Sequence, residues 1–177
     1  MKHSRLILAF CFALFLQLSL YAKDNTILEQ TTIKTISGES INVSKTKQGL
    51  VFKGYEDKII LLEMFGYGCP PCKAAIPAYK RLQEKYKKDI VVIAVEVWGS
   101  DDAKLKQYAK SYGLDYKAVS KANSGKVVSF VGSLTGWNTG TGVPYLMLLS
   151  RGGDIAKDVP PQIFPEAYVD GLIKEML

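Results

Sequence analysis

The sequence predicts an α/β domain in which helices flank a central mixed sheet. Two near-continuous apolar runs, Lys58 to Phe65 and Ile90 to Val97, have the length of strands that are covered on both faces. Between them, Pro71 to Lys87 carries apolar side chains at helical spacing. A strand, a helix and a second strand in this order form a βαβ unit. Such a unit implies a parallel pair with a right-handed crossover.

A β-hairpin is expected ahead of this unit. Thr31 to Ile36 has the composition of a strand, Ser37 to Ser40 predicts a turn, and Ile41 to Val43 predicts a short return strand. The residues from Lys45 to Lys58 are mostly polar and include two glycines. We therefore expect this stretch to lie over the surface.

The second half of the chain predicts a helix, several short elements, a long loop, a hairpin and a closing helix. Asp101 and Asp102 begin the first of these helices, and Gly113 provides its stop signal. The remaining predictions are a strand at Tyr116 to Val119, a helix at Gly125 to Val131, a loop at Gly132 to Gly142, a strand at Tyr145 to Leu149, a turn at Arg151 to Asp154 into Ile155 and Ala156, and a helix at Pro165 to Leu177.

The N-terminus has the features of a targeting signal. Lys2 and Arg5 precede an apolar run from Leu6 to Leu20, and Ala22 offers a small residue at a cleavage site. We expect a signal peptide over residues 1–22 and one domain over residues 23–177, placed in the periplasm or another extracytoplasmic compartment. The apolar run is short for a membrane span and Gln17 interrupts it, so a retained membrane anchor is the minority alternative.

Cleavage would leave 155 residues and lower the formal net charge from +6 to +4, because two bases leave and no acid does. This length supports one domain with a core of its own. The remaining charge is spread along helices, which does not indicate a nucleic-acid partner.

The small number of cysteines and histidines excludes several kinds of site. The only histidine is His3, and the only cysteines beyond the signal are Cys69 and Cys72. A histidine-based triad and a four-ligand zinc site are therefore excluded, and we expect no bound metal. Lys73 occupies the position where a c-type haem attachment would need histidine. Redox chemistry of the cysteine pair is what remains.

The order of residues around the two cysteines predicts their roles. A thiolate attacks disulfides, and a helix that begins just after Cys69 would stabilise that thiolate. Pro70 and Pro71 suit the opening of a helix, but each lacks an N–H that could point at the sulfur. This leaves Cys72 and Lys73 as the nearest amides, and such moderate stabilisation favours a reductant. Cys72, one turn into the helix, is expected to resolve the mixed disulfide.

Glu63 interrupts the apolar run that leads into the motif. If this carboxylate is buried, its pKa is raised and it can exchange a proton with Cys72. The alternative is a glutamate that faces solvent or pairs with a lysine.

These motifs resemble those of thioredoxin-fold proteins, and in detail those of the exported TlpA/ResA-like thiol–disulfide oxidoreductases. The resemblance covers about Thr31 to Leu177. It rests on the leading hairpin, on the active-site motif Cys69-Pro70-Pro71-Cys72-Lys73, on the helix proline Pro77 and on Gly142-Val143-Pro144. The resemblance implies a thioredoxin-like fold with an N-terminal hairpin extension. It also implies a cis bond before Pro144, in a loop that lies against the disulfide and contacts substrate through Val143 and Pro144.

One departure from the family concerns the rim of the site. The family usually has tryptophan directly before the first cysteine, where this chain has Gly68 with Tyr67 before it. We take Tyr67 and Trp137 as candidate substrate contacts, with Trp137 replacing the missing aromatic. The alternative for Trp137 is an indole packed beneath the loop.

The sequence thus predicts a periplasmic reductase of disulfides in exported proteins, with the Cys69–Cys72 pair as redox centre and no other cofactor. The resemblance implies a membrane thiol reductase as electron donor and apocytochromes c as candidate clients. The alternatives are a disulfide oxidase, an isomerase, and a non-catalytic thioredoxin-fold binding protein or chaperone. DsbA-type oxidases carry a large helical insertion. In this chain the strand at Ile90 follows the active-site helix too closely to leave room for one there. A peroxiredoxin would need threonine where Gly66 stands.

Overall fold

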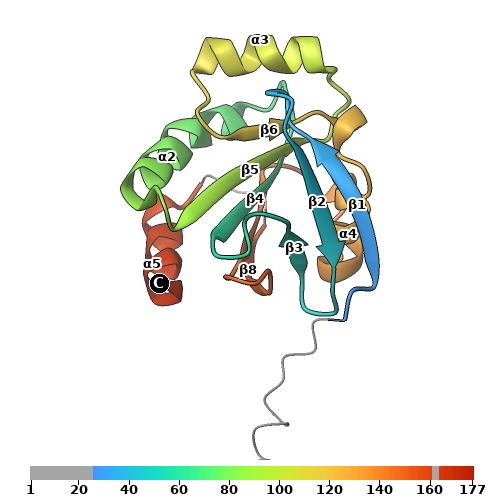
Figure 1. The fold of residues 1–177 in the computed structure, drawn as a ribbon. Coiled ribbons are helices and arrows are strands. Elements are labelled where there is room, and N and C mark those ends of the chain that lie inside the picture. Colours follow the sequence, from blue (N-terminus) through green and yellow to red (C-terminus); the bar gives the residue numbers. More distant parts are fainter. Residues whose placement is uncertain (1–25, 161–163) are drawn as a thin grey trace, which may run out of the picture.

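A computed structural model describes residues 26–160 and 164–177 (Figure 1). The predicted signal peptide lies outside the described residues. The chain forms a five-stranded mixed sheet of order β6-β5-β4-β7-β8 and a three-stranded antiparallel sheet of order β1-β2-β3. The strands of the central sheet are β4 (Ile59–Phe65), β5 (Ile90–Glu96), β6 (Lys117–Val119), β7 (Tyr145–Leu149) and β8 (Ile155–Val159).

Strand β4 lies at the middle of the central sheet, parallel to β5 and antiparallel to β7. All seven residues of β4 and all seven of β5 are buried, as their apolar runs predict for strands covered on both faces. The register places Glu63 between Ala94 and Leu146. Because successive side chains point to opposite faces, Glu63 shares its face with Leu61 and Phe65.

Helix α2 (Pro70–Tyr86) covers that face together with α5 (Glu166–Met176). The two helices lie side by side and are joined by the ion pairs Arg81–Glu166 and Lys85–Asp170 (Figure 1). The buried residues of α2 recur at helical spacing and form its inner face. The α2 residues buried there are Cys72, Ala75, Ile76, Ala78, Tyr79, Leu82 and Tyr86. The helix continues through Pro77.

Helix α3 (Asp102–Tyr112) begins and ends where its capping residues predict. Asp101 accepts the N–H of Lys104 at 2.8 Å, and Gly113 adopts the left-handed conformation after the last turn. The leading hairpin, β1 (Glu29–Lys34) and β2 (Ser40–Lys45), packs with α4 (Val127–Thr135) against the other face of the central sheet.

Two local predictions were wrong. The stretch from Lys45 to Lys58 contains a third strand, β3 (Leu50–Phe52), whose Leu50 and Phe52 side chains are fully buried. Gly49 lets this strand reach the central sheet, because a Cβ there would lie 2.1 Å from the Gly153 carbonyl oxygen. The predicted loop from Gly132 also begins four residues too early, since α4 continues to Thr135 and stops at left-handed Gly136.

Among the described residues, no helix combines the length and the apolar character that crossing a membrane requires.

Candidate active site

The two cysteines lie at the junction between β4 and α2 and form a disulfide bond. Cys69 is the N-cap of α2, and its N–H donates to the carbonyl oxygen of Gly66 at 3.0 Å. Cys72 lies on the buried face of the first turn. Each cysteine is only 2% exposed. A reacting partner must therefore contact the residues around the disulfide in order to reach the sulfur.

Among the residues that the structure describes, one backbone N–H is directed at the sulfur of Cys69. The amide of Cys72 donates to Cys69 Sγ at 3.1 Å. The amide of Lys73, expected as a second donor, instead donates to the carbonyl oxygen of Cys69 at 3.1 Å. Pro70 and Pro71 occupy the first two helical positions and have no N–H. The helix N-terminus therefore stabilises negative charge on Cys69 through one hydrogen bond and through its dipole.

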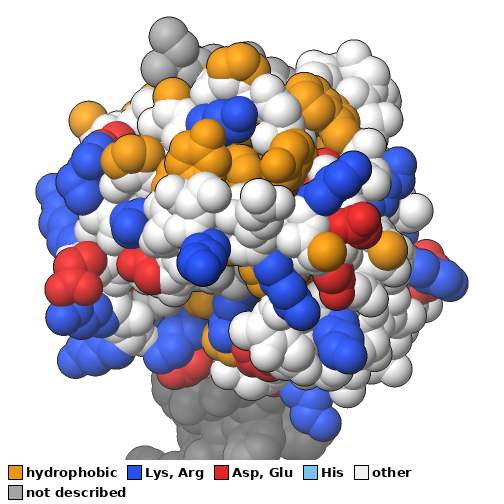
Figure 2. Space-filling model, turned by 90° about the horizontal axis from the view of Figure 1, so that it is seen from above, with side chains coloured by type: hydrophobic (Ala, Val, Ile, Leu, Met, Phe, Trp, Pro, Cys, Tyr) orange, Lys and Arg blue, Asp and Glu red, His pale blue; other side chains and the backbone are white. Residues whose placement is uncertain are grey.

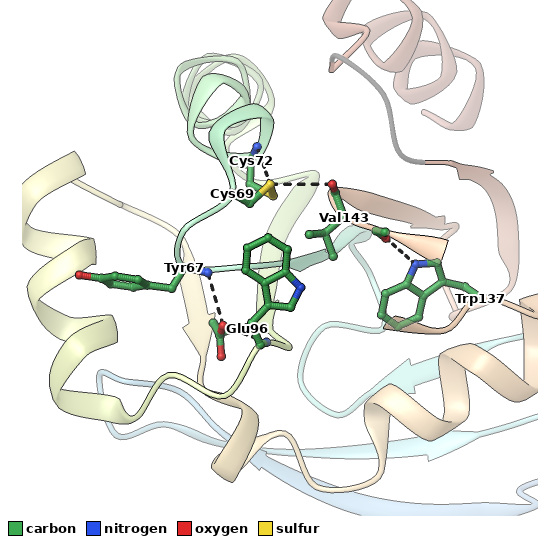
Figure 3. The surroundings of a disulfide bond; sticks show 8 residues. Tyr67, Cys69, Cys72, Glu96, Trp137 and Val143 are labelled. Atoms are coloured by element: carbon green, nitrogen blue, oxygen red, sulfur yellow. Dashed lines mark hydrogen bonds between the residues drawn. A yellow bond between two sulfur atoms is a disulfide. The ribbon is translucent and has the colours of Figure 1, made fainter. Parts of the chain in front are cut away.

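The positive charge of Lys73 lies over an aromatic ring. Its ammonium group lies 5.9 Å from the ring centre of Tyr112, at the end of α3. Tyr67 contributes to the same junction, because its ring packs 5.4 Å from that of Tyr108 on α3. Figure 3 shows the Tyr67 ring pointing away from the disulfide.

The loop before β7 meets the disulfide from the other side. The peptide bond between Val143 and Pro144 is cis, and the carbonyl oxygen of Val143 lies 3.8 Å from Cys69 Sγ (Figure 3). Val143 is partly buried and packs with the cysteines. The loop that the resemblance assigns to substrate binding is therefore next to the reactive sulfur.

Trp137 supports this loop from beneath. Its indole N–H donates to the carbonyl oxygen of Gly142 at 3.0 Å, and its ring stacks on Tyr145 with centroids 5.3 Å apart. The side chain is 5% exposed, which corrects the expectation of a substrate contact. The alternative interpretation, an indole packed beneath the loop, describes what the structure has. The position of Trp137 in the sequence could not distinguish a substrate contact from an indole beneath the loop, because both interpretations place Trp137 near Pro144.

Glu63 is 2% exposed and lies on the sheet face that α2 covers. Burial raises the pKa of Glu63 to about 8, and the nearby hydroxyl of Tyr79 on α2 opposes that shift. Neither Glu63 Oε1 nor the Tyr79 hydroxyl has a partner in hydrogen-bonding geometry among the described residues. The carboxyl group therefore neither faces solvent nor pairs with a lysine. It is a buried carboxyl group on the sheet face beneath the helix that carries Cys72.

Two further residues at this site were missed by sequence reasoning. Glu96, the last residue of β5, is fully buried, and its carboxylate accepts four backbone N–H groups. The donors are Tyr67 at 3.4 Å, Trp98 at 2.9 Å, Gly99 at 2.9 Å and Ser100 at 2.8 Å. The Trp98 side chain is 55% exposed. The sequence does contain a signal for the burial of Glu96, because this acid interrupts an apolar run as Glu63 does.

This arrangement can carry out thiol–disulfide exchange. It offers a sulfur at a helix N-terminus, a second sulfur one turn later, a buried carboxyl group that can exchange a proton, and a backbone carbonyl beside the first sulfur.

Comparisons with known proteins agree with this geometry. The model of the AhpC/TSA family matches residues 30–158. Chloroplastic thioredoxin F2 of Arabidopsis thaliana is 35% identical over 65 residues, which are 37% of this chain and 35% of that protein. The match thus spans about a third of that relative's length.

Two solved structures share the fold. A thiol:disulfide interchange protein of the thioredoxin family from Chlorobium tepidum aligns with a TM-score of 0.62 and 20% identity, covering 86% of this chain and 96% of that one. A secreted disulfide oxidoreductase from Mycobacterium tuberculosis aligns with a TM-score of 0.60 and 13% identity, covering 82% and 95%. These two structures confirm the thioredoxin fold. The family match agrees with the predicted oxidoreductase of the TlpA/ResA type.

Proposed function

Since this chain belongs to the AhpC/TSA family, we propose that it is a thiol:disulfide oxidoreductase that reduces disulfides of exported proteins through its Cys69–Cys72 dithiol. The observation that carries the proposal is the position of Cys69 Sγ. It lies between the first free amide of α2, that of Cys72 at 3.1 Å, and the carbonyl of Val143 at 3.8 Å.

In the first step, the Cys69 thiolate attacks one sulfur of the client disulfide. A bond forms between Cys69 Sγ and that sulfur, the client S–S bond breaks, and the other client sulfur leaves as a thiolate that takes up a proton. The backbone carbonyl of Val143 offers an acceptor for an N–H of the client chain beside the sulfur.

In the second step, Cys72 resolves the mixed disulfide. Glu63 accepts the Cys72 proton, and the resulting thiolate attacks Cys69 Sγ. The intramolecular disulfide forms, and the second client sulfur leaves and is protonated. The client gains two electrons and two protons, and the Cys69–Cys72 dithiol loses them. A carboxyl group with a pKa of about 8 suits this exchange, because both of its protonation states are populated near neutral pH.

The reducing direction rests on how weakly the reduced state is stabilised. A strongly oxidising couple is one whose thiolate form is held by several interactions. Here the two prolines leave one amide for the sulfur, and the ammonium of Lys73 lies over Tyr112 instead. A reduced Cys69 thiolate with so little support gives its electrons to a client disulfide.

The setting of the reaction follows from the sequence and the resemblance. Residues 1–22 read as a signal peptide, which would place the domain in the periplasm or another extracytoplasmic compartment. The TlpA/ResA-like resemblance supports a membrane thiol reductase as electron donor and apocytochromes c as clients. In this proposal the Cys69–Cys72 pair is the redox centre and needs no further cofactor.

The test is the reduction potential of the Cys69–Cys72 couple. Purified protein is equilibrated in redox buffers of defined potential, and the dithiol fraction is read by alkylation and mass spectrometry. We expect a value near or below about −270 mV, as in a thioredoxin. A value near about −120 mV would make the protein an oxidase.

A further inference from the structure

We propose that the indole of Trp98 determines specificity at the rim of the active site by receiving an apolar side chain of the client, next to the client's reactive cysteine. This inference rests on the proposed function and adds the class of client side chain that the site selects.

The first observation is exposure. At 55%, Trp98 has the highest exposed fraction among the large apolar side chains of the described part of the chain. A single exposed apolar side chain is ordinary on a protein surface. What makes this one informative is its position against the redox motif.

The second observation is contact with the motif's glycines. A Cβ on Gly66 would lie 2.3 Å from the Cδ2 and Cε3 atoms of Trp98, so the indole rests directly on the Gly66 backbone. A Cβ on Gly68 would lie 3.9 Å from Cζ3 of the same ring. The indole thus extends from Gly66 toward the residue that precedes Cys69.

The third observation is that the backbone carrying this indole is held in place. Oε1 of the buried Glu96 accepts the backbone N–H groups of Trp98 and Tyr67, which joins the loop after β5 to the loop after β4. Oε2 of Glu96 accepts the backbone N–H groups of Gly99 and Ser100, at 2.9 and 2.8 Å. A surface that is already ordered loses little conformational freedom when a client packs on it.

The fourth observation concerns what a client meets on its way to the sulfur. Both cysteines are 2% exposed, so a client chain must lie close over the surrounding residues to bring its sulfur to Cys69. These surroundings include Val143, which packs with the cysteines, and the Trp98 indole over Gly66 and Gly68. Figure 2 shows apolar side chains gathered at the end of the molecule where α3 lies.

These surroundings favour an apolar partner. The amides next to Trp98 are already taken by Glu96, which leaves the face of the ring as the exposed recognition element. Aromatic faces pack well against aromatic and aliphatic side chains. Trp98 therefore supplies from a neighbouring loop the aromatic surface that Gly68 lacks.

The test uses three synthetic peptides, each with one cysteine flanked by Phe, Ala or Arg, and each presented as a disulfide-linked homodimer. The reduced protein is mixed with each homodimer, the reaction is quenched with acid, and the free peptide is quantified by chromatography. We expect the wild type to react about threefold to tenfold faster with the Phe peptide than with the Ala peptide. Trp98→Ala brings the ratio close to one, and Trp98→Phe retains most of it.

Two controls separate specificity from chemistry. Glutathione disulfide offers no apolar side chain, and its reduction rate stays within about twofold across the variants. Tyr168→Ala removes another exposed aromatic, on α5, and leaves the Phe preference unchanged.

Each contrary outcome has its own meaning. A Phe preference that survives in Trp98→Ala overturns the inference and leaves the proposed function standing. A preference for Arg that depends on Trp98 overturns the apolar class. An equal slowing of glutathione and peptide reduction in Trp98→Ala overturns a specificity role, since Trp98 would then act on Cys69 itself. A wild type that reduces neither peptides nor glutathione disulfide overturns the proposed function and the inference together.

Discussion

The sulfur of Cys69 lies 3.8 Å from the carbonyl oxygen of Val143, a residue 74 positions later in the chain. The first belongs to the N-terminus of α2 and the second to the loop before β7 (Figure 3). Pairing of β4 with β7 brings the two segments together, because the register joins Met64, near the end of β4, to Tyr145, the first residue of β7. Strand pairing in the central sheet therefore places Val143 next to Cys69.

Replacing Cys72 with alanine should trap a mixed disulfide at Cys69. The first exchange step uses Cys69 alone, whereas release of the client needs the second sulfur. After incubation with a peptide disulfide, mass spectrometry under non-reducing conditions should find a covalent adduct on Cys72→Ala.

The matched control is Cys69→Ala, which should give much less adduct, because the helix N-terminus and the Cys72 amide stabilise a thiolate on Cys69 and not on Cys72. Equal adducts on both variants, or none on either, would contradict the assignment of attacking and resolving sulfurs. The second result would favour a non-catalytic binding protein.

Replacing Pro71 with alanine should raise the reduction potential. Pro71 is the second helical residue, a position whose N–H can reach the side chain of an N-cap residue. A second donor would stabilise the Cys69 thiolate, and one hydrogen bond to a charged group of about 1.5 kcal/mol corresponds to about 30 mV. Redox-buffer equilibration measures this shift.

Pro70→Ala provides the control, because the N–H of the first helical residue does not usually bond the N-cap side chain. The reduction potential of Pro70→Ala should shift by clearly less than that of Pro71→Ala. Equal shifts in the two variants would mean that a general change in the helix, and no specific amide, sets the potential.

The elements that carry the chemistry could be predicted because each has a strong local signal. Two long apolar runs and a Cys-Pro-Pro-Cys motif define β4, α2 and β5. The burial of Glu63 could be proposed because an acid inside such a run has few other interpretations. Strand β3 was missed because three residues between glycine and polar segments are too short to show a period.

The roles of Glu96 and Trp98 could not be predicted, because they depend on two loops meeting in space. An acid at the end of an apolar run predicts the end of a strand. Only the fold brings four amides to Glu96 and places Trp98 on Gly66. Sequence proximity to Pro144 instead drew attention to Trp137, whose indole supports the loop from below.

The burial of Glu63 should make the oxidised protein less stable as pH rises from about 4.5 to about 8. The folded carboxyl group keeps its proton to about 8, whereas the unfolded one releases it near the ordinary value of 4.5. Between these values the unfolded state binds fewer protons, so the free energy of unfolding falls by roughly 1.4 kcal/mol for each pH unit. Urea unfolding at several pH values measures the slope.

Glu63→Gln should flatten this dependence and be the more stable protein at pH 8. Tyr79→Phe should extend the falling range to higher pH, because the Tyr79 hydroxyl opposes the raised pKa of Glu63. A wild-type slope that Glu63→Gln leaves unchanged would show that other groups cause it. In kinetics, Glu63→Gln should slow release of the client from the mixed disulfide while leaving formation of that adduct unchanged.

Gly66→Ala should damage the protein only while Trp98 is present. The added Cβ would lie 2.3 Å from two ring atoms, so the indole or the motif loop must move. Overpacking of this kind costs about 1–3 kcal/mol where the neighbour cannot give way. In Trp98→Ala the ring is gone, and with it the three atoms that lie nearest to the added methyl group. The free energy of unfolding of the two single variants and the double variant therefore gives a coupling of at least about 1 kcal/mol.

Gly68→Ala serves as the matched case, since its Cβ would lie at an ordinary 3.9 Å from the ring. Its coupling to Trp98→Ala should be small. Additive effects of Gly66→Ala and Trp98→Ala would mean that the exposed indole swings away freely. A ring that moves so easily could not present a fixed surface to a client, so this one cycle also tests the geometry on which recognition by Trp98 depends.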